Sequence, residues 1–305
     1  MLRLLIPVFI YIGAVVGAGF ASGQEIAVFF GTDSSGFGIP IAGFLFTICA
    51  YRIFCDVNKY GISSYTEYLE EKTYFLAPFF KTVSALFCCA SYGIMVCGVN
   101  SVLQNYNMNY GGLIFALFCF VIFMFDLKGV AVINIISTPL IIIGMLSVGF
   151  KSIPVFAVQT LKTTYYAAYN MLACLPVLCG LNVYIKNKKQ SLFIALTSGF
   201  ILTFLMLIVN IITPLDYGEM PMLVQARNVN MDVLYSLVLI LAMLTTAVSN
   251  GFGFVKSTNI KPIYSNIILF VTALVMLSFG FAPLVEKVFV FFGALSTALL
   301  FFILF

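Results

Sequence analysis

The chain has 305 residues, of which 62% are hydrophobic and only 9% are charged. A soluble domain carries about a quarter charged residues, so this composition excludes an ordinary soluble fold and makes lipid the solvent for much of the surface. The net charge of +4 is small and spread along the chain, which excludes the basic patch that nucleic-acid binding requires.

Apolar segments of about 20 residues predict membrane-spanning helices, because an open strand cannot satisfy its backbone in lipid. We expect an all-α protein with ten such helices in one transmembrane domain over 1–305. The first is a retained helix and not a signal peptide, since no small-residue cleavage pattern interrupts it. In chain order the predicted spans are 2–30, 36–56, 76–103, 111–126, 129–150, 163–185, 191–212, 231–255, 264–281 and 284–304.

The basic residues of the loops predict the orientation, because cytoplasmic loops carry an excess of Lys and Arg. With the N-terminus in the cytoplasm, eleven of the 15 basic residues lie inside and only four lie outside. The four are Lys151, Lys162, Arg227 and Lys287.

Ten spans divide into two predicted repeats of five helices, 2–150 and 163–304. An odd number of helices in each repeat inverts the second repeat relative to the first. Inverted repeats are typical of secondary transporters, whose sites lie where the first helix of each repeat is broken.

The first span contains Gly13, Gly17, Gly19 and Gly23 in its middle. Each glycine costs about 1 kcal/mol in a helix interior, so this is the weakest stretch of the span. An unwound turn here would free carbonyl groups for a cation and amide groups for a carboxylate. The alternative is close helix packing, because Gly13 and Gly17, like Gly19 and Gly23, have GxxxG spacing.

The sixth span carries a matching irregularity and is predicted to be broken as well. Asn170 is polar near its middle, Pro176 removes a backbone hydrogen bond, and Tyr166 and Tyr169 share a helix face. Asn170 would bond either to a substrate or to a neighbouring helix, and the tyrosines are either ligand contacts or packing residues.

The eighth span contains the adjacent hydroxyl residues Thr245 and Thr246. Neutral oxygen ligands at membrane depth suit a hard cation such as sodium. The alternative is that each hydroxyl bonds to the carbonyl four residues earlier in its own helix.

The sequence contains eight cysteines, no CxxC spacing and no histidine. Zinc and haem sites are therefore not expected, and the cysteines are interpreted as small apolar packing residues. An intramembrane enzyme would need paired acids, metal ligands or a Ser/His arrangement, so we expect no enzyme.

Together these segments resemble the sodium-coupled amino-acid transporters with the LeuT fold, in the amino acid/polyamine/organocation superfamily. Gly13-x-x-Val16-Gly17-x-Gly19 resembles the family's broken first helix, Gly36-Phe37-x-Ile39-Pro40 resembles the start of its second, and Ala242-x-x-Thr245-Thr246 resembles its sodium-binding eighth helix. The run from Gly17 to Ile26, GAGFASGQEI, is similar to the signature of the bacterial YkvI-type membrane proteins, and that similarity covers the whole chain.

The resemblance implies a LeuT-like fold of two inverted five-helix repeats with helices 1 and 6 broken. It implies a sodium site and a substrate site at the breaks. The implied sodium ligands are the Gly13 and Val16 carbonyls with Ala242, Thr245 and Thr246. The implied substrate contacts are Val15, Gly17, Gly19, Tyr92, Tyr166, Tyr169 and Asn170. The asparagine and arginine that flank the break in the well-studied transporters are replaced here by Phe20 and the pair Gln24-Glu25.

Glu25 is the one acidic residue inside a predicted span and clear of its ends. An intramembrane carboxylate is a functional candidate by default. Gln24 and Glu25 are therefore predicted coupling or gating residues, and Glu25 would carry a proton, bind a cationic substrate or pair across an outer gate. The alternative is that Glu25 only hydrates an aqueous vestibule.

These features predict a secondary transporter, coupled to sodium or protons, for a small amino-acid-like or organic-cation solute. It would act by alternating access in the bacterial inner membrane, with the bilayer and the solute as partners and no cofactor beyond Na⁺ as the coupling ion. The alternative is a nutrient-sensing receptor or a channel-like protein on a transporter scaffold.

Overall fold

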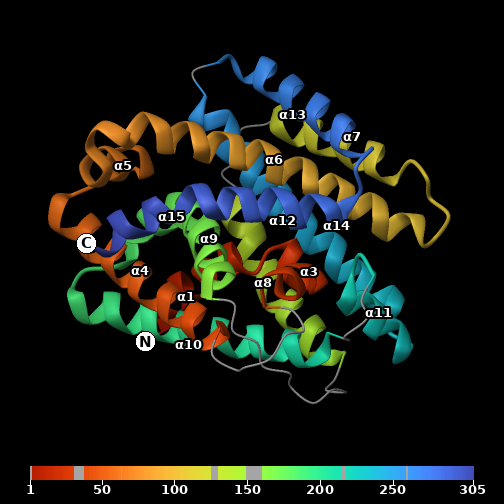
Figure 1. Ribbon diagram of the computed structural model, residues 1–305, viewed down its shortest axis with the longest axis horizontal. Coiled ribbons are helices and arrows are strands. Elements are labelled where there is room, and N and C mark those ends of the chain that lie inside the picture. Colours follow the sequence, from red (N-terminus) through yellow and green to blue (C-terminus); the bar gives the residue numbers. More distant parts are fainter. Residues whose placement is uncertain are drawn as a thin grey trace.

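The structure is a computed structural model, and it describes residues 2–30, 38–62, 64–124, 130–148, 160–213, 218–258 and 260–305. Within these ranges every regular element is a helix, joined by turns and loops (Figure 1). Parts of three predicted spans, at 36–37, at 125–126 and at 129 with 149–150, lie outside the described residues.

Every predicted span coincides with at least one helix. The helices of the first half are α1 (Leu2–Val15), α2 (Ala18–Ser22), α3 (Gln24–Phe30), α4 (Gly38–Tyr60), α5 (Tyr65–Thr73), η1 (Tyr74–Leu76), α6 (Ala77–Gln104), α7 (Gly111–Met124) and α8 (Val130–Ser147). Those of the second half are α9 (Thr160–Gly180), η2 (Leu181–Tyr184), α10 (Lys188–Ile212), α11 (Pro221–Asn228), α12 (Asp232–Ser257), α13 (Pro262–Met276), α14 (Phe281–Leu284), η3 (Val285–Phe289) and α15 (Val290–Leu304).

In the described part of the chain, six helical stretches are long and apolar enough to cross a membrane. They are Gly38–Tyr60, Tyr65–Gln104, Leu161–Tyr184, Lys188–Ile212, Asp232–Val255 and Phe281–Leu304. Four further apolar helices are shorter, at Leu4–Val15, Gly111–Met124, Ser137–Ser147 and Pro262–Met276. The protein is therefore an all-helical, multi-pass membrane protein.

The first predicted span is broken twice. The helical ladder of α1 stops where the Gly17 amide donates to the Val15 carbonyl at 2.8 Å, instead of to the Gly13 carbonyl four residues back. The second break is at Gly23, which has a left-handed φ of 79° and separates α2 from α3. The glycine run therefore unwinds the span, as its propensities predict.

The prediction that the sixth span is broken is wrong. Helix α9 runs without interruption from Thr160 through Pro176 to Gly180. Asn170 does not divert the backbone, because its side-chain amide donates to the Tyr166 carbonyl one turn earlier at 2.9 Å. The irregularity comes only at the helix end, where the 3₁₀ turn η2 follows Gly180.

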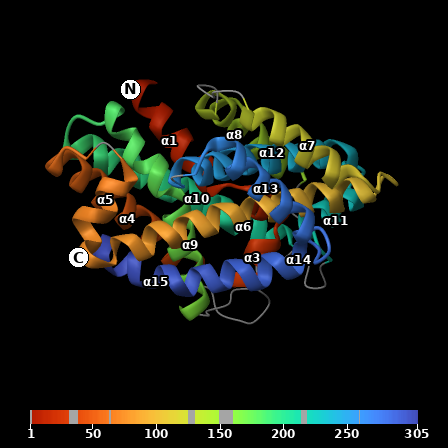
Figure 2. The ribbon, with the colours of Figure 1, turned by 90° about the horizontal axis from the view of Figure 1, so that it is seen from above.

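The helices pack in two groups. In the first group, α1 and α4 each contact both α9 and α10. In the second group, α6 contacts α7, α12 and α13, and these three helices also contact one another. Helix α8 joins the groups by contacting α1 and α12, and α15 joins them by contacting α4, α6 and α9. Figures 1 and 2 both show α15 running alongside the long helix α6. Each group thus combines helices from both halves of the chain.

Helix α11 covers one end of the broken span. A β-carbon on Gly23 would lie 2.9 Å from Cγ of Met222 in α11, so only a glycine lets the two segments approach this closely. The hydroxyl of Tyr235 in α12 donates to the Ala21 carbonyl at 2.6 Å. Contacts from α11 and α12 therefore hold the second break in place.

Replacing Gly23 with alanine is expected to lower the thermal unfolding temperature of the purified protein. A left-handed conformation costs a non-glycine residue about 1–2 kcal/mol, and the added β-carbon also crowds Met222. Gly180→Ala is the control, because no atom lies within 4 Å of a β-carbon there. Equal unfolding temperatures for the two variants would contradict the strained turn at Gly23.

Candidate functional site

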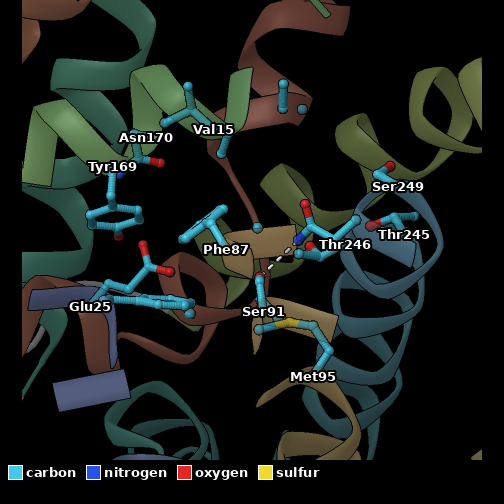
Figure 3. A pocket seen from close by; sticks show the side chains of 18 of the residues that line it. Val15, Glu25, Phe87, Ser91, Met95, Tyr169, Asn170, Thr245, Thr246 and Ser249 are labelled. Carbon is cyan, nitrogen blue, oxygen red and sulfur yellow. Dashed lines mark hydrogen bonds between the residues drawn. The ribbon is translucent and has the colours of Figure 1, made fainter. Parts of the chain in front are cut away.

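A cavity of about 70 Å³ lies at the first break, between the two helix groups (Figure 3). It exceeds the roughly 10–15 Å³ that a single water molecule requires. The broken span and α9 line it from one group, α6 and α12 line it from the other, and Phe289 joins them from η3. The lining residues are Gly13, Ala14, Val15, Gly17, Ala18, Gly19, Glu25, Phe87, Ser91, Met95, Tyr169, Asn170, Ala173, Val177, Thr245, Thr246, Ser249, Asn250 and Phe289.

One end of the cavity is lined by hydroxyl groups of α12. Thr246 lies against the break, since a β-carbon on Gly17 would be 3.1 Å from its Oγ1. The hydroxyls of Thr245 and Thr246 both donate to the Ala242 carbonyl at 2.9 Å. Because these bonds use only the hydroxyl protons, both lining oxygens keep lone pairs that can accept a cation.

Gly13, the one glycine of α1, permits a close approach of α8 to the broken span. A β-carbon on Gly13 would collide with Oγ1 of Thr138 in α8. The Gly17 amide bonds to the Val15 carbonyl, so the Gly13 carbonyl loses the partner that a continued helix would provide. Carbonyl and hydroxyl oxygens, the ligands that hard cations prefer, are thereby brought to one side of the cavity.

The opposite end of the cavity is formed by Glu25. The left-handed turn at Gly23 directs its side chain back along α2, where a β-carbon on Gly19 would collide with Oε1. Glu25 is only 5% exposed, and among the described residues it forms no ion pair. Figure 3 places the carboxylate and the two threonines on opposite sides of the cavity.

Aromatic rings surround this carboxylate end. Tyr169 stacks on Phe289 at a centroid distance of 5.0 Å, and Phe87 lies 6.0 Å from Tyr169 and 5.9 Å from Phe289. The Tyr169 hydroxyl faces the Glu25 carboxylate (Figure 3). That hydroxyl is buried, and no partner among the described residues meets hydrogen-bond geometry with it.

Between the two ends lies a polar pair that the sequence interpretation did not assign. The Asn250 amide of α12 donates to the Ser91 hydroxyl of α6 at 2.8 Å, the bond drawn as a dashed line in Figure 3. Asn250 follows the threonine pair by one helical turn, and this polar stretch was the signal that could have indicated it.

Nine of the residues predicted for the site line the cavity, and five do not. The nine are Gly13, Val15, Gly17, Gly19, Glu25, Tyr169, Asn170, Thr245 and Thr246. The five that the structure places elsewhere in the described residues are Val16, Gln24, Tyr92, Tyr166 and Ala242.

Three of the five have a packing explanation. Tyr92 lies against Phe123 of α7 at 5.6 Å, and its neighbour Ser91 faces the cavity instead. Tyr166 is enclosed by rings from α3 and α4, Phe29 at 5.4 Å and Phe46 at 5.8 Å. The Gln24 side chain is buried away from the cavity.

Val16 and Ala242 differ from these three, because the predicted ligands are their backbone carbonyls and not their side chains. The Ala242 carbonyl accepts the hydroxyls of the two lining threonines, and Val16 lies in the unwound segment between Val15 and Gly17.

Among the described residues, the lining of the cavity is more exposed at one end than at the other. The lining residues Ala14 near the end of α1, Val177 near the end of α9 and Asn250 of α12 are partly exposed. Toward α3 and α11, Glu25 and Phe289 are buried, and so is Met222 of the covering helix. The structure is therefore closed on the side of α11 and more open on the side of the N-terminus.

Comparison with known proteins finds relatives in sequence and solved structures of similar fold. The chain is 25% identical to "Uncharacterized protein YyaD" of Bacillus subtilis (strain 168) over 315 residues, covering 95% of this chain and 92% of that protein. It is 24% identical to "Uncharacterized membrane protein YkvI" of the same organism over 326 residues, with the same coverage. No family model matches the chain.

One of the solved structures of similar fold is a Na⁺-coupled sialic acid symporter in a substrate-bound, outward-open state. The TM-score is 0.58 at 12% sequence identity, and the match covers 97% of this chain and 77% of the symporter. That protein is a transporter and not an enzyme. The chain is thus a homologue of YyaD and YkvI that has the fold of a sodium-coupled symporter.

Proposed function

We propose that the protein is a cation-coupled secondary transporter of a small solute, with Na⁺ as the coupling ion. The observation that carries the proposal is the cavity at the unwound Val15–Gly17 segment, in contact with Thr245 and Thr246 of α12. The fold shared with a sodium-coupled symporter supports it.

In this proposal sodium binds at the threonine end of the cavity. The Gly13 and Val16 carbonyls of the broken span, the Ala242 carbonyl and the two threonine hydroxyls are its ligands. The ion would join the broken span to α12, which belong to different helix groups. Ion binding would then stabilise one relative position of the groups, which is how a coupling ion alters a conformational equilibrium.

The two groups are the proposed moving parts of alternating access. The group of α1, α4, α9 and α10 contains the first two helices of each predicted repeat, and the group of α6, α7, α12 and α13 contains the third and fourth. This division is expected of ten helices in two inverted five-helix repeats, a LeuT-like arrangement. With the N-terminus in the cytoplasm, the structure corresponds to an inward-facing state closed by α11.

The proposal is tested by uptake into proteoliposomes that contain the purified protein. Radiolabelled amino acids and organic amines are supplied under an inward sodium gradient, an inward proton gradient or no gradient. We expect accumulation above the external concentration only with the sodium gradient, and its loss when a sodium ionophore collapses that gradient.

Three results would contradict this function. Accumulation driven by the proton gradient alone would exclude sodium as the coupling ion. Entry that only equilibrates the solute, whatever the gradient, would indicate a channel-like protein. Solute binding without any movement would indicate a receptor on a transporter scaffold.

A further inference from the structure

We propose that Glu25, Tyr169, Phe87 and Phe289 form a subsite for the protonated amino group of the solute. This inference deepens the proposed function, since it assigns the chemical class of the transported molecule. It rests on the geometry of the cavity end opposite the threonines.

The first observation is a carboxylate with no described counter-charge. Glu25 is the one charged side chain among the described residues that line the cavity, and it forms no ion pair there. The ammonium group of Lys162, near the start of α9, donates to the Val28 carbonyl of α3 at 3.3 Å instead. An isolated carboxylate at membrane depth requires a cationic partner or a proton.

The second observation is the set of rings around the carboxylate. Tyr169, Phe87 and Phe289 lie within 6.0 Å of one another, centroid to centroid, and all three line the cavity. Aromatic faces carry negative electrostatic potential, so they attract a cation and are poor neighbours for a second anion. The carboxylate and the rings therefore both favour a positively charged ligand.

The third observation is the Tyr169 hydroxyl, which is aimed at this end of the cavity. Tyr169 is 2% exposed, and its hydroxyl has no hydrogen-bond partner among the described residues. An ammonium group has several N–H donors, of which one can bind the Glu25 carboxylate and another the Tyr169 oxygen. A quaternary ammonium group has no such donors, so the structure favours a protonated amine.

The protein also holds Glu25 in a fixed position. The turn at Gly23 and the absence of a side chain at Gly19 place the carboxylate over the broken span. The Ser22 hydroxyl donates to the Gly19 carbonyl at 2.9 Å, and the backbone amide of Gln24 donates to the Ser22 hydroxyl at 3.2 Å. These bonds make Ser22 and Gln24, which flank Gly23, part of a rigid support for the subsite.

The test is a binding measurement that needs no gradient and no transport. Wild-type protein in detergent with 100 mM NaCl is titrated with matched pairs that differ in the amino group: alanine and lactate, ethanolamine and ethylene glycol, and butylamine and butanol. Binding is read as stabilisation against thermal unfolding and by calorimetry. We expect at least one amine to bind, and its partner without nitrogen to bind at least tenfold more weakly.

The variants locate the effect at the subsite. Glu25→Gln, which keeps the side-chain shape, is expected to weaken amine binding at least tenfold, and Tyr169→Phe is expected to weaken it several-fold. Glu286→Gln is the control for loss of an acid, because Glu286 is exposed and lies outside the cavity. If Glu25→Gln does not fold, Tyr169→Phe and Phe289→Leu provide the same test.

Equal binding of the matched pairs, no response to any amine, or wild-type amine affinity in Glu25→Gln would overturn the subsite. If the Glu25 carboxylate only exchanged a proton and did not bind the solute, the Glu25→Gln variant would keep wild-type amine affinity. The failures are distinguishable, because an amine that binds at Glu25 without being accumulated contradicts the transporter alone. Accumulation of solutes that lack nitrogen contradicts the subsite alone.

Discussion

Replacing Thr245 and Thr246 together with alanine is expected to abolish the sodium dependence of uptake. Each single variant should raise the half-saturating sodium concentration at least tenfold, which corresponds to about 1.4 kcal/mol of lost ion binding. The reason is that both hydroxyl oxygens face the cavity beside the unwound segment and have no equivalent replacements in alanine. The measurement is initial uptake into proteoliposomes as a function of external sodium.

Thr297→Ala is the matched control for this experiment. Like the Thr246 hydroxyl, the Thr297 hydroxyl bonds to the carbonyl four residues earlier in its helix, that of Gly293, at 2.9 Å, but Thr297 does not line the cavity. If bonding within the helix were the only role of these threonines, all three substitutions would have similar small effects. Unchanged sodium dependence in the double variant would refute the proposed ion site.

A second large effect is expected from Gly19→Ala, which should reduce solute uptake at least tenfold. The added β-carbon would occupy the position of the Glu25 carboxylate and force it out of the cavity end. Glycine-to-alanine changes in helices are otherwise stabilising, so the protein should still fold. The measurement is initial uptake at saturating sodium, with the thermal unfolding temperature as a check of folding.

Gly180→Ala provides the control, because a β-carbon there meets no atom within 4 Å. Wild-type uptake in Gly19→Ala would show that the carboxylate position is unimportant for transport.

The sequence was sufficient to locate the break in the first span. Glycine propensity identified the weakest stretch, and α1 indeed ends at Val15, two residues before Gly17. The second break was not expected, because GxxxG spacing does not reveal which glycine adopts a left-handed conformation. Gly23 does so where Met222, from a helix about 200 residues later in the chain, packs against it.

The position of Glu25 could not be derived from helical rise alone. A continuous helix would have carried it about 9 Å from Gly19 along the membrane normal, six residues at 1.5 Å each. The turn at Gly23 brings the carboxylate back to Gly19, so the residue belongs to the cavity and not to a distant vestibule. One glycine conformation decides between these two outcomes.

In the sixth span, the sequence suggested a break that the structure does not have. Asn170 and Pro176 both suggested a broken helix, yet α9 is continuous because the asparagine amide bonds to a carbonyl of its own helix. Phe87 and Phe289 were not predicted as site residues, because no sequence pattern distinguishes them from the rest of the 33 phenylalanines. Only the packing of α6 and η3 against α9 and α3 brings their rings to the cavity.

In the proposed mechanism, solute and cation movements are coupled through the cavity. Sodium uptake driven by a solute gradient tests this coupling most directly. Proteoliposomes are equilibrated with equal ²²Na⁺ on both sides, and a solute found to be transported is then added outside. The proposed mechanism predicts that ²²Na⁺ accumulates inside wild-type proteoliposomes while solute enters, and that it does not in the Thr245→Ala/Thr246→Ala variant. Solute entry that moves no sodium would contradict the mechanism.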